Sequence, residues 1–197
     1  MRFDPFTRLL HLLLASGVTL QLLLSLFMVD PRPDRPADLW FEIHQAVGFA
    51  LFVVLPVHWL WSLSRSYGGD FGMLMPWFSR RRLDALRNDL HLMAREFGDR
   101  RIPSAETQRP LPAAVEGLGL LTASYMALSG ALWSLLSSPN GGGAGLPHFF
   151  KESHQLVANA RWVYVIGHAG MAMLHQLGGE PILRSMFGFG KDRRRIP

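Results

Sequence analysis

Four apolar segments of membrane-spanning length constrain the fold of this chain more than any other feature. Their approximate bounds are residues 8–29, 40–64, 111–136 and 153–177. A helix of roughly 20 mainly apolar residues crosses a hydrocarbon core about 30 Å thick and satisfies its own backbone hydrogen bonds there. We therefore predict an all-α membrane protein, in which four transmembrane helices form a bundle and residues 1–197 form one domain.

The distribution of basic residues predicts the orientation of these helices. Nine Arg lie in the connection from Arg65 to Arg109, and five basic residues follow from Arg184 onward. The other two connections contain only Arg32 and Arg35, and Lys151. Because short loops rich in Lys and Arg stay in the cytoplasm, both termini are predicted to be cytoplasmic. The first segment shows no small-residue cleavage site, so we interpret it as a retained helix.

The connection between the second and third segments contains a predicted amphipathic helix. Over residues 80–97, apolar side chains recur at helical spacing and the remaining face is rich in Arg. We predict that this helix lies on the cytoplasmic membrane surface, with docking of a partner subunit as the alternative. The sequence pI of about 10.4 then reflects contact with anionic lipid, and the absence of a nucleic-acid motif predicts no nucleic-acid partner.

Histidines recur at a fixed spacing within the apolar segments. His44 and His58 are fourteen residues apart in the second segment, and His154 and His168 are fourteen apart in the fourth. Fourteen residues of α-helix advance about 21 Å and return to within about 40° of the starting direction. Each pair therefore lies on one helix face at two depths. His11 opens the first segment, at the depth predicted for His58 and His168.

Paired imidazoles at two depths are typical of two stacked haems. Imidazole binds haem iron axially, and a chain with no Cys holds neither covalent c-type haem nor a thiolate iron–sulfur cluster or zinc site. Near the predicted outer surface, depth matches His44 with His154. Near the inner surface, His168 has two partners by depth, His11 and His58, and the repeated spacing alone favours His58.

Two further residues within the apolar segments are candidates for the site. Gly48 lacks a Cβ, so a flat macrocycle can approach its helix closely, although simple helix packing is the alternative. Arg161 lies midway between His154 and His168 and needs a partner, either a haem propionate or a polar seam. The third segment contains no histidine, and we assign helix packing to its small residues, which are Gly117, Gly119, Ser124, Ser129 and Gly130.

Several short stretches resemble the bacterial cytochrome b561 family, which includes the cytochrome b subunits of nickel–iron hydrogenase and formate dehydrogenase. They are Arg8-Leu9-Leu10-His11, His44-Gln45-Ala46-Val47-Gly48, Ser153-His154 and Gly167-His168. The resemblance spans all four segments. It implies a multi-pass protein of the bacterial inner membrane with two haems b, whose iron ligands are His11 with His168 and His44 with His154. Relatives commonly carry Arg at position 58, so His58 becomes a hydrogen-bond donor at the inner haem edge, or the alternative inner ligand.

These features together predict electron transfer between a quinone pool and a redox partner such as a dehydrogenase, a hydrogenase or cytochrome c. The sequence shows no acid–base or nucleophile constellation, so no catalytic residue is assigned and the chain is interpreted as an electron-transfer subunit. A homodimer in membrane lipid is compatible with the pattern. The alternatives are a stand-alone oxidoreductase that passes electrons from quinol to superoxide, a haem-free metal or proton transporter that uses the same histidines, and a structural anchor.

Overall fold

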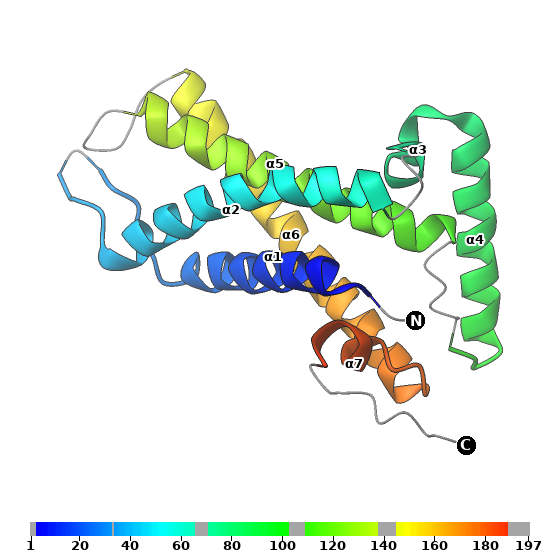
Figure 1. Cartoon of the computed structure of the whole chain (residues 1–197). Coiled ribbons are helices and arrows are strands. Elements are labelled where there is room, and N and C mark those ends of the chain that lie inside the picture. The colour runs from blue at the N-terminus through cyan, green and yellow to red at the C-terminus, as the bar shows by residue number, and fades with distance from the viewer. Residues whose placement is uncertain (1–2, 33, 66–70, 103–108, 138–144, 189–197) are drawn as a thin grey trace.

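The computed structural model describes residues 3–32, 34–65, 71–102, 109–137 and 145–188, and every regular element within them is helical. Four long helices pack on one another, and we refer to them together as the bundle: α1 (Pro5–Leu24), α2 (Leu39–Arg65), α5 (Pro110–Leu136) and α6 (Leu146–Leu177). The remaining elements are α3 (Phe71–Leu74), η1 (Pro76–Phe78), α4 (Arg80–Gly98) and α7 (Ile182–Phe187). Figure 1 shows these remaining elements gathered at the end of the bundle where α1 begins.

Three of the described helices are long and apolar enough to cross a membrane, namely α1, α2 and α5. Although α6 is the longest helix, with 32 residues, it is more polar because it carries histidines and Arg161. Its polar and apolar side chains nevertheless separate in space. Arg161 is buried, whereas large apolar side chains along α6 are exposed: Leu156, Val163, Ile166, Met173 and Leu177. The side of α6 away from the bundle is therefore apolar.

Helix α5 organises the bundle because its small residues allow neighbouring helices to approach closely. It packs against both α2 and α6, and α1 packs against α2, whereas α1 and α6 touch only sparsely. A Cβ added at Gly117 would lie 1.8 Å from the backbone oxygen of Leu74, so glycine is required where α3 crosses α5. Close packing of small residues is a typical source of helix association in membranes. Few residues of α1 and α6 approach each other closely, and we call the interface between these two helices the seam.

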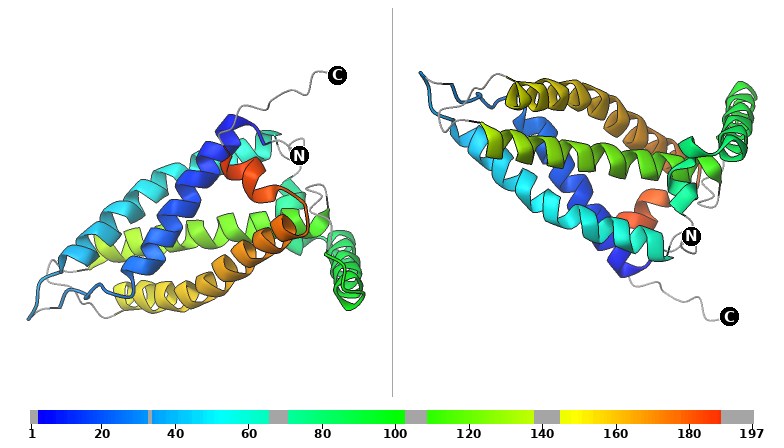
Figure 2. Two further views of the ribbon diagram at one scale, coloured as in Figure 1. Left: turned by 90° about the horizontal axis from the view of Figure 1, so that it is seen from below. Right: turned by 90° about the horizontal axis from the view of Figure 1, so that it is seen from above.

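Helix α4 runs across the end of the bundle instead of along it (Figures 1 and 2). It corresponds to the segment 80–97 that the sequence predicts as an amphipathic surface helix. One buried carboxylate holds it in place: Asp89 accepts hydrogen bonds from Arg109 Nε at 2.7 Å and from Leu111 N at 3.0 Å. Leu111 N belongs to the first turn of α5, where backbone donors lack partners within the helix. Asp89 therefore joins α4 to the start of α5.

Two long helices differ in their bounds from the predicted segments because capping residues lie outside the apolar runs. The sequence predicts 8–29, but α1 begins at Pro5, where Asp4 accepts hydrogen bonds from Phe6 N and Thr7 N, and it ends at Leu24. The sequence predicts 153–177, but α6 begins at Leu146, directly after Gly145, whose φ is +74°. Proline in the first turn is favourable at both starts.

The contact between α4 and α5 can be tested by replacing Asp89. In Asp89→Ala, Arg109 and Leu111 N lose a buried acceptor, which typically costs about 1–3 kcal/mol for a bond to a charged group. We expect trypsin to cleave after Arg100 and Arg101 several-fold faster than in the unaltered protein in detergent, as mapped by mass spectrometry. Asp84→Ala is the matched control, because Asp84 is exposed on the same helix and pairs only loosely with Arg87. Equal cleavage rates in both variants would contradict this role of Asp89.

Candidate functional site

Two pairs of histidines face each other at two levels of the bundle. We call His11 and His168 the inner pair, and His44 and His154 the outer pair. In the inner pair the ring centroids of His11, on α1, and His168, on α6, are 6.3 Å apart. In the outer pair the ring centroids of His44, on α2, and His154, on α6, are also 6.3 Å apart. Helix α6 thus contributes one imidazole to each pair, fourteen residues apart.

The separation of the rings suits a metal held from both sides. An iron bonded by one imidazole nitrogen on each side at about 2 Å places the two ring centres roughly 6 Å apart. The rings are too far apart for a direct hydrogen bond between them, and the Nδ1 atoms of His11 and His44 have no hydrogen-bond partner within the described residues. The donor set at each level is therefore two nitrogen ligands, which fits bis-imidazole haem.

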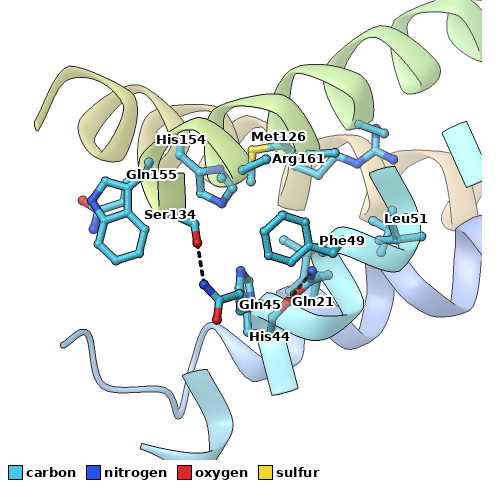
Figure 3. A pocket seen from close by; sticks show the side chains of 18 of the residues that line it. Gln21, His44, Gln45, Phe49, Leu51, Met126, Ser134, His154, Gln155 and Arg161 are labelled. Atoms are coloured by element: carbon cyan, nitrogen blue, oxygen red, sulfur yellow. Dashed lines mark hydrogen bonds between the residues drawn. The ribbon is translucent and has the colours of Figure 1, made fainter. Parts of the chain in front are cut away.

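The outer pair borders a cavity between the helices. About 1070 Å³ there is not filled by protein atoms, with the open mouths of the cavity included, and the lining is mainly apolar. Figure 3 shows His44 and His154 on opposite sides of this space, with Met126 and Phe49 beside it. A space of this size and polarity is typical of a site for a large, flat and mostly apolar ligand.

Hydrogen bonds reach both residues of the outer pair, the imidazole ring of His154 and the backbone of His44. The Ser129 hydroxyl donates to Met126 O at 3.2 Å, and its oxygen lies 3.0 Å from His154 Nδ1. With its own proton donated to Met126 O, the Ser129 hydroxyl oxygen is placed to accept a proton from Nδ1; in that tautomer the lone pair is on Nε2, the nitrogen available to a metal. On the other side, Gln21 Nε2 donates to the backbone oxygen of His44 at 2.9 Å.

Two glycines make room at the outer pair. Gly48 lines the cavity, and a Cβ there would lie 2.9 Å from Gln21 Nε2, so the absence of a side chain admits the glutamine that binds His44 O. A Cβ at Gly130, on α5, would lie 3.3 Å from His154 Cε1. Both positions are therefore tight because the imidazoles and their hydrogen-bond partners come close to the backbone of a neighbouring helix.

The inner pair lies in the seam between α1 and α6. His168 is exposed there, and its ring is stacked on Tyr164 with the centroids 5.6 Å apart and the planes 7° apart. Phe187 of α7 contacts the ring of His11 at a centroid distance of 5.7 Å. Arg8 holds α7 in this place by donating from Nε to Met186 O at 3.0 Å and also to Gly188 O. Helix α7 thus bridges α1 and α6 beside the inner pair.

The third candidate at the inner level, His58, does not join the inner pair through a ring contact in the described part of the chain. It is buried on α2, its Nδ1 has no hydrogen-bond partner, and it is close enough to His11 for the two imidazoles to interact electrostatically. The structure therefore brings His168 to His11 and leaves His58 beside them.

Arg161 lies between the two levels on the same face of α6. Its Nη1 donates to Gly119 O at 2.6 Å and to Thr122 Oγ1 at 2.7 Å, and both acceptors belong to α5. Its guanidinium carbon lies 4.8 Å from the centroid of the Tyr164 ring. Of the two partners that the sequence predicts for Arg161, the polar seam is present in these contacts.

Sequence analysis did not identify several residues that contact the histidine pairs, namely Gln21, Ser129, Tyr164 and Phe187. Ser129 is interpreted there as a packing residue, and nothing in a run of small residues separates a serine that binds imidazole from one that only packs. Tyr164 is not singled out, although its position offers a signal. It precedes His168 by four residues, a spacing that places two side chains next to each other on one face of a helix.

An all-helical fold with apolar spans and facing pairs of histidines defines a membrane protein of the b-type cytochrome class. The model of the prokaryotic cytochrome b561 family matches residues 2–189, so the chain belongs to this family. No curated protein and no solved structure matches it significantly. Membership confirms the resemblance noted in the sequence, and it assigns haem b and electron transfer in a membrane as properties of the family.

Proposed function

We propose that this chain is a diheme b-type cytochrome, in which His44 and His154 bind one haem b and His11 and His168 bind the other. The observation that carries the proposal is the equal 6.3 Å separation of the two histidine pairs at two levels of the bundle. Neither pair is joined by a hydrogen bond between its own rings, and the one interhelical bond of His154, to Ser129, involves Nδ1 and leaves Nε2 to a ligand. Two pairs with the same ring separation favour two cofactors of the same kind.

The surrounding residues suit such a cofactor. When bound, haem b supplies a one-electron ferric–ferrous couple. Ser129 keeps His154 in the ligating tautomer, and Gly48 and Gly130 keep side chains away from the approach to the outer cavity. At one mouth of that cavity Lys151 pairs with Asp30 at 2.6 Å, and this lysine would supply the cation that a haem propionate needs. His58 takes the role of a hydrogen-bond donor at the edge of the inner haem.

We further propose that α6 is the fourth transmembrane helix and that both termini are cytoplasmic. The exposed apolar side chains of α6 face away from the bundle, while its cation Arg161 is buried against α5. The end of the bundle that carries α4 and α7 also carries most of the Arg residues, as the cytoplasmic side does in membrane proteins. The outer pair then lies toward the exterior of a bacterial inner membrane and the inner pair toward the cytoplasm.

Haems at two levels suit the movement of electrons across the membrane between the quinone pool and a partner redox protein. Quinones dissolve in the hydrocarbon layer, and the inner pair lies in the α1–α6 seam, where His168 is exposed. The partner classes that fit are a dehydrogenase, a hydrogenase and a soluble cytochrome, with a homodimer as one form of the assembly. The second candidate function, oxidation of quinol by this chain alone with superoxide as the product, differs in needing no partner protein.

Haem content tests the central proposal. For protein purified in mild detergent, we expect a dithionite-reduced minus oxidised spectrum of low-spin haem b and two haems per chain by pyridine haemochrome. Variants then assign the ligands: His44→Ala and His154→Ala should lose the same haem, and His11→Ala and His168→Ala the other, as distinguished by electron paramagnetic resonance. His58→Ala should keep two haems.

His148→Ala is the matched control, because His148 lies on α6 and is exposed near Glu152. Folded protein with no haem would overturn the proposal and favour the transporter alternative. Loss of the inner haem in His58→Ala, with its retention in His11→Ala, would transfer the ligand role to His58.

Replacing Ser129 tests the tautomer argument separately. In Ser129→Ala the Nδ1 proton of His154 loses its acceptor, and loss of such a supporting hydrogen bond typically weakens metal binding about 10- to 100-fold. When the apo-protein is titrated with haem, we expect the affinity for the outer haem to fall about 10- to 100-fold and the affinity for the inner haem to stay the same. Ser153→Ala is the control, because Ser153 lies on the same helix, is half-buried and donates only to the backbone of its own helix. An unchanged outer affinity would show that Ser129 only packs.

A further inference from the structure

Arg161 occupies the midpoint between the two histidines that α6 contributes. It follows His154 by seven residues and precedes His168 by seven, so each step advances about 10 Å along the helix and returns nearly to the same face. Its side chain is only 5% exposed, and it lines the inward end of the outer cavity (Figure 3). The same guanidinium lies over Tyr164, whose ring is stacked on His168. Arg161 is therefore close to both sites.

The positive charge of Arg161 is solvated by dipoles and not neutralised by an anion. Its two hydrogen bonds go to a backbone carbonyl and a hydroxyl, and its Nε has no partner. Among the residues that the structure describes, Arg161 forms no salt bridge. The carboxylate of Glu116, which lies on α5 near this level, accepts a hydrogen bond from Ser62 at 2.9 Å. A guanidinium keeps its proton under ordinary conditions, so a full charge remains in the interior.

Helix α5 is shaped to hold this cation. Gly119 supplies the accepting carbonyl, and a Cβ at the same residue would lie 2.2 Å from the Tyr164 hydroxyl. The Tyr164 hydroxyl in turn donates to Val115 O at 3.1 Å, which fixes the ring below the guanidinium. An unneutralised buried charge is costly, so a set of contacts that retains one indicates a use for the charge.

We infer that Arg161 is a fixed cation shared by the two haem sites, which raises the reduction potentials of both haems. The inference rests on the proposed diheme function. Reduction adds one electron to a ferric haem and lowers its charge by one, so a nearby positive charge stabilises the ferrous state. At about 10 Å and an effective dielectric constant of about 20, one charge changes a one-electron equilibrium by about tenfold. Arg161 would act through its electric field and not as an iron ligand, so it is a tuning residue.

A redox titration of the purified holoprotein tests this inference. In Arg161→Gln we expect both haems to be retained and both midpoint potentials to fall, each by a change of about tenfold in the reduced-to-oxidised ratio, or about 59 mV for a one-electron couple. Arg161→Lys keeps the charge, so we expect its two midpoint potentials to differ from those of the unaltered protein by much less than about 59 mV. Tyr164→Phe removes the hydroxyl but retains the stacked ring and the charge, so it is the control for disturbed packing.

The outcomes separate this inference from the function on which it rests. Unaltered protein without two haems refutes the diheme proposal itself. Two haems with unchanged potentials in Arg161→Gln overturn the tuning role while the diheme function stands. A shift at only one haem overturns the shared role, and an equal fall in Arg161→Lys shows that packing and not charge sets the potentials. If Arg161→Gln fails to fold, Arg161→Met, which buries an apolar chain of similar length, gives the same comparison.

Discussion

The structure depends on supplying hydrogen-bond partners to strongly polar side chains that lie between the helices. The lining around His154 and Arg161 of α6 is mainly apolar, so a neighbouring helix has to supply their polar partners. Helix α5 is that neighbour. Its Ser129 hydroxyl meets His154, and its Gly119 carbonyl and Thr122 hydroxyl meet Arg161. Its glycines bring the two backbones close enough for these contacts, so the helix without a histidine sets the environment of the histidines.

Polar contacts also organise the end of the bundle where α1 begins. Arg8 binds backbone oxygens at the end of α7, and Arg109 binds Asp89 of α4. The positive-inside rule counts these arginines only as basic residues, so it does not predict the individual hydrogen bonds that they form. Each one attaches an element outside the bundle to a long helix. As a result α7 covers one edge of the inner pair, and α4 stays across the bundle end.

The helical class, the apolar segments and the two levels of histidines could be predicted because periodicity alone determines them. Depth and spacing alone could not select His11 over His58, and the choice of His11 came from the family resemblance. In the structure the packing of the helices brings the His11 ring to His168. Average hydropathy leaves α6 out of the candidate membrane spans. It counts Arg161 as polar, although Arg161 is buried and large apolar side chains are exposed along the same helix. The contact of Ser129 with His154 could not be predicted, because a serine in a helix of this kind can either pack closely or form a hydrogen bond through its hydroxyl.

The choice of arginine at position 161 follows from the geometry of its partners. A guanidinium is planar, its charge is delocalised and it is more weakly hydrated than an ammonium group, so moving it into hydrocarbon costs less. One of its nitrogens reaches two acceptors on α5 while its flat face lies against Tyr164. A lysine offers a compact charge with no plane to stack. The arrangement thus holds one permanent charge at a defined position between His154 and His168, with its hydrogen bonds supplied by α5.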